Sequence, residues 1–83
     1  MKLGVVGIII EGDISVAGNV NEILSGYGDL IIGRMGLPKP EENVYLISLG
    51  VKGSNEKISA LTGKLGRLKG VKVKSAVTDV DVN

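Results

Sequence analysis

Two short segments carry side chains that could bind a ligand. The first is the turn Glu11-Gly12-Asp13, which follows an apolar run and precedes a predicted helix. Backbone N–H groups at the start of a helix have no partner inside the helix, so such a turn can hold a small anion or a carboxylate. The two acidic side chains disfavour an anion, and plain capping of the helix by Asp13 is the alternative. We take Glu11, Gly12 and Asp13 as candidate ligand-binding residues.

Arg34 is the second candidate. It lies in a mostly apolar predicted strand, between Gly33 and Met35. An arginine in such a strand needs a carboxylate partner, a position at the rim of the sheet, or a ligand. Two alternatives therefore stay open. Arg34 forms a salt bridge to Glu41 or Glu42, across a hairpin or between subunits, or it clamps a ligand.

Several other kinds of chemistry are excluded by composition. The chain has no cysteine and no histidine, which removes disulfides, thiolate nucleophiles, the commonest metal ligand and the usual general base near neutral pH. The acidic residues do not follow the spacing of a calcium loop. The segment Gly63-Lys64-Leu65-Gly66 lies inside a predicted helix and is not followed by Ser or Thr, so it is not a phosphate-binding loop. We expect no enzyme activity, no catalytic or metal-binding residues and no cofactor.

Size and charge limit the partners. Eighty-three residues suit one domain. A formal net charge of +1 and an aromatic content of 2% argue against direct binding of nucleic acid. No apolar stretch approaches the ~20 residues of a membrane span, and the apolar run after Met1 stops at Glu11 without a signal-peptide cleavage site. We expect a cytoplasmic protein that contacts neither membrane nor DNA directly.

The elements that position these residues follow from apolar periodicity. Four apolar or alternating runs predict strands, and two segments with apolar residues at helical spacing predict helices. The order strand, helix, strand, strand, helix, strand is the split βαβ pattern, and right-handed crossovers place both helices on one side. We therefore predict an α+β fold, a ferredoxin-like βαββαβ two-layer sandwich with a four-stranded antiparallel sheet and two helices on one face. The predicted domain covers residues 1–77, and residues 78–83 form a C-terminal tail.

Both faces of the predicted sheet are apolar. Two helices cover one face only, so the other face would expose an apolar patch in a monomer. Either a second subunit covers this patch, or a tail or loop of the same chain does. We expect a homo-oligomer, a dimer or a tetramer. The residues expected at its interface are Val6, Ile8, Ile10, Tyr45, Ile47 and Leu49.

Two glycines stand out in the second predicted helix. Gly63 lies opposite the apolar stripe of this helix, and Gly66 lies on its flank. Glycine weakens a helix by about 1 kcal/mol relative to alanine. Either another backbone approaches this surface, or the helix is simply weak there.

Three segments together resemble a known family. They are Arg34-Met35-Gly36-Leu37-Pro38, then Glu41-Glu42-Asn43, then residues 58–75 with the sequence ISALTGKLGRLKGVKVKS. They are similar to the small stand-alone proteins proposed to regulate the iron-only hydrogenase system. That family is related in fold to ACT domains and to the C-terminal domain of the nickel-responsive repressor. The resemblance covers most of the chain, from the first strand to the fourth.

The resemblance implies a regulatory module that assembles through its sheets and binds a small metabolite at a subunit interface. ACT domains often bind amino acids near the first strand-to-helix turn, which matches Glu11, Gly12 and Asp13 in position. Nickel sensing does not carry over, because the repressor uses histidines and a cysteine that this chain lacks. The repressor's DNA-binding segment has no counterpart here either. The alternative function is a protein-interaction subunit with no small ligand.

Overall fold

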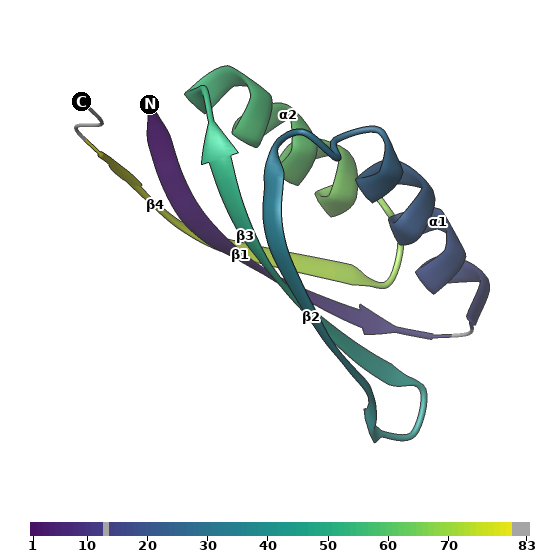
Figure 1. The fold of residues 1–83 in the computed structure, drawn as a ribbon. Coiled ribbons are helices and arrows are strands. Elements are labelled where there is room, and N and C mark those ends of the chain that lie inside the picture. The colour runs from purple at the N-terminus through teal and green to yellow at the C-terminus, as the bar shows by residue number, and fades with distance from the viewer. Residues whose placement is uncertain (13, 81–83) are drawn as a thin grey trace.

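The computed structural model describes residues 1–12 and 14–80 and has the predicted βαββαβ order. The strands pair antiparallel in the order β2-β3-β1-β4, and both helices lie on one face of the sheet (Figure 1). The fold prediction is therefore confirmed. The elements are β1 (Lys2–Glu11), α1 (Ile14–Ser25), β2 (Ile31–Glu41), β3 (Val44–Gly53), α2 (Asn55–Gly66) and β4 (Val71–Asp79).

The core fills the space between the helices and the sheet. Alternate residues of β1 and β3 point into this space, because successive side chains of a strand point to opposite faces. The helices contribute one apolar stripe each, as their 3.6-residue periodicity predicts. The buried residues of the core are Val6, Ile8, Ile10, Val20, Leu24, Leu30, Ile47, Leu49, Val51, Ile58, Leu61, Leu65 and Val71.

The other side of the sheet carries no helix, and we call it the open face. Strand register fixes its membership. Ile8 pairs with Ile47 on the helix side, so their neighbours Ile9 and Leu46 pair on the open face. On the far side of β1, Ile9 pairs with Lys72 of β4, which places Lys72 on the open face too. Alternation along each strand therefore places one set of residues on the helix side and the other set on the open face.

Gly70 joins the end of α2 to β4 and holds the end of β1 in place. Its φ is +83°, a left-handed conformation that favours glycine, and a Cβ added there would collide with the Glu11 carbonyl oxygen. The backbone N–H of Glu11 donates a hydrogen bond to the Gly70 carbonyl oxygen at 2.7 Å.

The start of α2 is capped by Ser54, whose hydroxyl accepts from the backbone N–H of Lys57 at 3.2 Å.

The opposite end of β4 is tied to the start of β1. Asp79 forms an ion pair of 2.7 Å with Lys2, and the Lys2 ammonium, by hydrogen bond and by charge, holds the pKa of Asp79 below its ordinary value. The N–H of Val80 donates to the Met1 carbonyl oxygen at 3.1 Å. β4 thus extends two residues beyond the predicted domain limit at residue 77. Residues 81–83 of the predicted tail lie outside the described part of the chain.

Candidate functional site

The residues expected at a subunit interface lie on the helix side of the sheet. Val6, Ile8, Ile10 and Leu49 are at most 1% exposed in the single chain, and Ile47 is buried with them. Tyr45 is partly buried and packs against the same core. Those positions are therefore not available to another subunit, and the expectation named the wrong one of two apolar faces. The physical reason is that α1 and α2 already cover them.

The exposed apolar residues gather on the open face instead. Three of them, including Val5 and Ile9, come from the central strand β1, and three, including Met35, come from the edge strand β2. Ile32 lies there as well, since a Cβ added to Gly50 would contact its side chain at 3.4 Å. Six large apolar side chains on the open face are between 38% and 62% exposed: Leu3, Val5, Ile9, Ile32, Met35 and Leu37.

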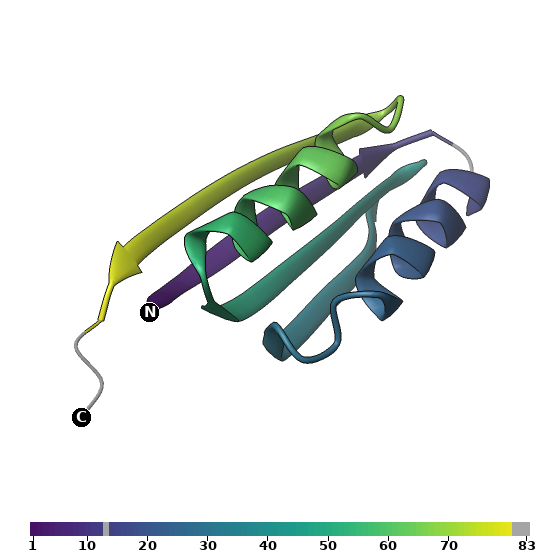
Figure 2. The same cartoon turned by 90° about the horizontal axis from the view of Figure 1, so that it is seen from above.

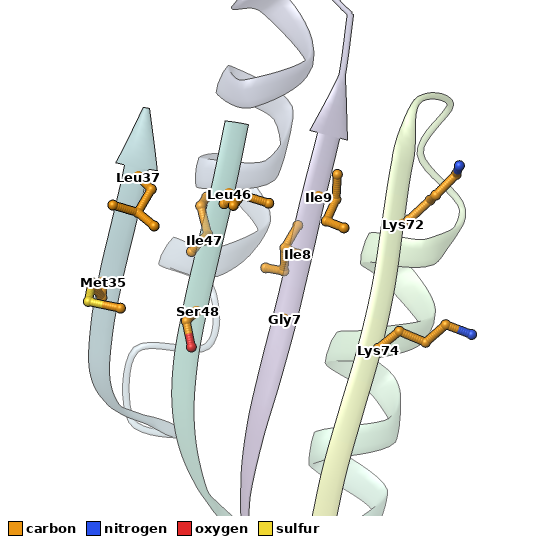
Figure 3. Close-up of a pocket in the computed structure, with 10 residues that line it drawn as sticks. All are labelled: Gly7, Ile8, Ile9, Met35, Leu37, Leu46, Ile47, Ser48, Lys72 and Lys74. Carbon is orange, nitrogen blue, oxygen red and sulfur yellow. The ribbon is translucent and has the colours of Figure 1, made fainter. Parts of the chain in front are cut away.

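A shallow depression of about 360 Å³ lies in the middle of this face (Figure 3). Its apolar part comes from three strands, with Ile9 on β1, Leu46 on β3, and Met35 and Leu37 on β2. Gly7 lies on β1 between Ser48 of β3 and Lys74 of β4 and has no side chain to fill the space. Ser48 adds one hydroxyl at its margin. The depression has the size of a small-molecule site, and such sites are mostly apolar with few polar groups.

Lysines line one margin of the depression. Lys72 and Lys74 lie on β4, and Figure 3 shows their side chains extending from this strand away from β1. Lys72 also approaches Glu11, with 3.6 Å between Nζ and Oε1. An exposed apolar face is predicted from the sequence, but the wrong set of alternate residues is assigned to it, although the signal that separates the two sets is present. In β4 the lysines alternate with Val71 and Val73, and the lysine side of a strand is the side without helices.

The turn after β1 does not offer its first N–H groups to a ligand. The N–H of Glu11 donates to Gly70, and the N–H of Gly12 donates to the Asn43 carbonyl oxygen at 3.0 Å. Both donors are therefore satisfied by the backbone and are not available to a ligand, while the binding of a ligand at the start of the helix stays a prediction. Asp13, the third candidate, lies outside the described residues.

Arg34 contacts α1. Its guanidinium donates a hydrogen bond to the side-chain oxygen of Asn21, and neither Glu41 nor Glu42 is its ion-pair partner within the part of the chain that is described. Arg34 pairs with Leu49 on β3, whereas Glu11 pairs with Val44. Five residues of β3 separate these partners, roughly 17 Å at the rise of a strand. The structure therefore does not bring Arg34 and Glu11 into one site.

Residues 1–12 and 14–80 contain neither a metal-binding cluster nor a membrane-spanning helix. Acidic residues in this part of the chain do not gather in groups of three or more that would hold a metal ion. No helix there is both long enough and apolar enough to cross a membrane.

Comparison with solved structures defines the class of fold. The ACT domain from the GTP pyrophosphokinase of Chlorobium tepidum superposes with a TM-score of 0.71 at 18% identity, covering 98% of this chain and 91% of that one. The chain therefore has the ACT-like, ferredoxin-like fold. A protein of Thermotoga maritima, TM1266, is more similar, with 36% identity and a TM-score of 0.88 over 95% of this chain and 100% of that one.

A family model gives the particular assignment. The TM1266-like family, described as "Iron-only hydrogenase system regulator, putative", matches residues 2–75. The chain belongs to this family. Among curated proteins no match was found.

Proposed function

We propose that this protein is a regulatory module that works as a homo-oligomer, in which a second copy of the chain covers the open face and a small metabolite binds at the interface. The observation that carries the proposal is the group of six large apolar side chains exposed on that face. Contiguous exposed apolar surface of this kind is typical of interaction sites. Membership of a family described as regulators supports the regulatory role.

The size of the open face suits a pair of identical sheets. Strands of about ten residues, at about 3.3 Å per residue and with four strands about 4.8 Å apart, give a face of roughly 600 Å². Two such faces in contact would bury roughly 1,200 Å² in total, at the lower end of stable interfaces. A domain of 83 residues has a thin core, so covering this face also adds stability that the single chain lacks.

In this proposal the metabolite binds in the depression around Gly7. A second sheet laid over the open face would close this hollow and shield its contents from water. The apolar lining from Ile9, Leu46 and Met35 favours a small, mainly apolar molecule. The ligand would then touch both subunits, which couples its binding to assembly.

The assembly is tested by Val5→Lys. Val5 is 56% exposed on the open face, so the single chain tolerates a lysine there, but two facing copies would bury its charge. Sedimentation velocity should give a multiple of the 8.6 kDa chain mass for the wild type and a smaller multiple for Val5→Lys. The matched control is Asn19→Lys, which adds the same charge on the exposed surface of α1 and should keep the wild-type mass.

The two possible failures point in different directions. If the wild type sediments as a monomer, or if Val5→Lys keeps the wild-type mass, the open face is not the interface.

A thermal-shift screen of amino acids, nucleotides and small acids tests the metabolite separately. A flat result with an intact oligomer would remove the ligand and leave a protein-interaction subunit.

A further inference from the structure

The two edges of the sheet differ in their ability to pair with another strand. β2 forms one edge, and its pairing with β3 shifts register between Ile31 and Gly33 and again between Pro38 and Glu41. Its two prolines have no N–H to donate. β4 forms the other edge, contains no proline, and pairs with β1 without a shift from Val71 to Asp79. Bulges and prolines are the devices that block edge pairing, and only β2 has them.

The outer side of β4 presents a row of backbone groups. In an antiparallel pair, residues bonded to the neighbouring strand alternate with residues whose N–H and C=O point away from it. Val80 donates to Met1, so the even-numbered residues of β4 are the ones bonded to β1. The N–H and C=O groups of Val73, Ser75 and Val77 therefore point outward from the edge of the sheet.

The surface beside this edge is built from small residues. A groove of about 550 Å³ runs between α2 and β4, and its helix side consists of Ser59, Thr62, Gly63 and Gly66. Among the described residues, a Cβ added to Gly63 or to Gly66 would meet no atom within 4 Å outside its own stretch of α2. Packing inside the single chain therefore does not require glycine at these two positions, although each glycine weakens α2 by about 1 kcal/mol relative to alanine.

We infer that β4 pairs antiparallel with β4 of a second copy of this chain, about a two-fold axis at Ser75, to form a continuous eight-stranded sheet. This contact goes beyond the proposed function, because it uses the edge of the sheet and not its open face. With both contacts made, two extended sheets stack into a closed tetramer of dihedral symmetry.

The register follows from the charges on β4. An axis at Ser75 pairs the whole strand with itself and places Lys72 opposite Thr78 and Lys74 opposite Ala76. An axis at Val73 would place Lys72 opposite Lys74, and an axis at Lys74 would place that residue opposite itself. Like charges directly opposite one another destabilise a sheet. The outward groups also match, because an axis at Ser75 sets Val73 against Val77.

Helix spacing explains the glycines. Figure 2 shows α2 lying above the space between β1 and β4. Pairing of two β4 strands would place the two α2 helices about two strand spacings apart, or ~10 Å. Packed helices lie 8–10 Å apart, and the closest approach needs small side chains at the contact. Gly63 and Gly66 supply them on the side of α2 that faces the edge.

A single cysteine tests the axis directly, because the chain has no cysteine of its own. Ser75→Cys places two thiols opposite each other at a bonded pair, where Cα atoms lie about 5.5 Å apart, within disulfide range. Mild oxidation should convert this variant to a covalent dimer on a non-reducing gel. Val77→Cys is the control on the same strand and side, because its own copy would lie four residues away, or ~13 Å.

The register has a second readout. Neither Val73→Cys nor Val77→Cys should cross-link alone, whereas a mixture of the two should give the mixed dimer. If Ser75→Cys forms no more covalent dimer than Val77→Cys does, the pairing about Ser75 is overturned. An open-face contact would not produce the Ser75 link, because this side chain is on the helix side of the sheet.

The helix contact is tested by Gly63→Gln in the Ser75→Cys background. Glutamine fills open space in the single chain and is a better helix former, so the fold is retained. The cross-linked fraction should fall severalfold. Gly18→Gln is the matched control, because Gly18 also has no atom within 4 Å of its Cβ but lies on α1. Equal cross-linking in both variants would overturn the helix contact.

The edge contact and the open-face contact fail independently. Loss of the Ser75 cross-link, with Val5→Lys still lowering the mass, would remove the edge pairing and leave the proposed function. A strong Ser75 cross-link, with Val5→Lys at the wild-type mass, would keep the edge pairing and remove the open-face assembly.

Discussion

At the scale of single residues, three glycines of this chain lie in different structural settings. Gly70 has a left-handed backbone against the Glu11 carbonyl, so the fold requires it. Gly7 leaves a hollow on the open face. A Cβ added to Gly63 would meet no other element within 4 Å in the described part of the chain, so packing inside the single chain does not require a glycine there. The sequence identifies all three as glycines, but it does not distinguish the required one from the others.

Gly70→Ala should destabilise the fold more than its small size suggests. The left-handed conformation costs a non-glycine residue about 1–2 kcal/mol, and displacement of Glu11 weakens a backbone hydrogen bond of about 1 kcal/mol. We expect the free energy of unfolding, measured in urea, to fall by about 2–3 kcal/mol. Gly18→Ala should instead raise the free energy of unfolding by about 1 kcal/mol, because the added Cβ meets open space on α1 and alanine favours the helix. Similar values for both variants would refute a special role for Gly70.

At the scale of the elements, the sequence predicts the strands and helices but not which sheet face the helices cover. In β1 both sets of alternate residues are apolar, so Val6 and Ile8 look no different from Val5 and Ile9. The lysines of β4 separate the two faces, and so do Ser48 and Lys52 of β3, but they assign the faces of β1 only when the register of these strands against β1 is known. Register depends on contacts between distant segments, which periodicity along one strand does not contain.

The strand β1 also carries the test of the depression. Gly7→Val should fill it, since the nearest atom that the new Cβ would meet on another described strand is the Lys74 carbonyl oxygen, at an ordinary contact distance of 3.8 Å. Any compound found by thermal shift should then lose its stabilising effect, while the far-UV circular dichroism of the protein stays the same. The control is Gly33→Val, on the same face but outside the depression, with no atom within 4 Å of its Cβ. A ligand that responds equally to both variants binds elsewhere.

The candidate ligand residues show a related limit of prediction. The sequence predicts a turn at Glu11 and Gly12, whereas in the structure Glu11 ends β1 and Gly12 follows it, and the partners of their N–H groups, Gly70 and Asn43, come from two distant loops. Arg34 was recognised correctly as a residue that needs a partner, and the structure supplies Asn21 from α1 in place of a nearby glutamate. In each case the residue was visible in the sequence, and its partner depended on the tertiary fold.

At the scale of the whole molecule, the sheet is longer than the helix layer that covers it. The chain measures 44 × 20 × 17 Å, and the β2–β3 hairpin extends beyond both helices (Figure 1). A single chain of this shape leaves much of its apolar surface in water. Stability of the fold and self-association are therefore expected to be linked.

This linkage predicts that the melting temperature depends on protein concentration. Association stabilises the folded state by mass action, so the melting temperature of the wild type should rise by a few degrees per tenfold increase in concentration. Val5→Lys should melt at a temperature that changes less with concentration, because its open face no longer pairs. A wild-type melting temperature that is constant over a hundredfold range would contradict the link.

The proline-containing edge strand β2 also has a consequence for how large an assembly grows. A subunit with two usable edges has a valence of two and adds further subunits without limit, as in a fibril. Here the register shifts and prolines of β2 leave β4 as the one regular edge, so the valence for edge pairing is one. Such a chain terminates its own growth after a single addition.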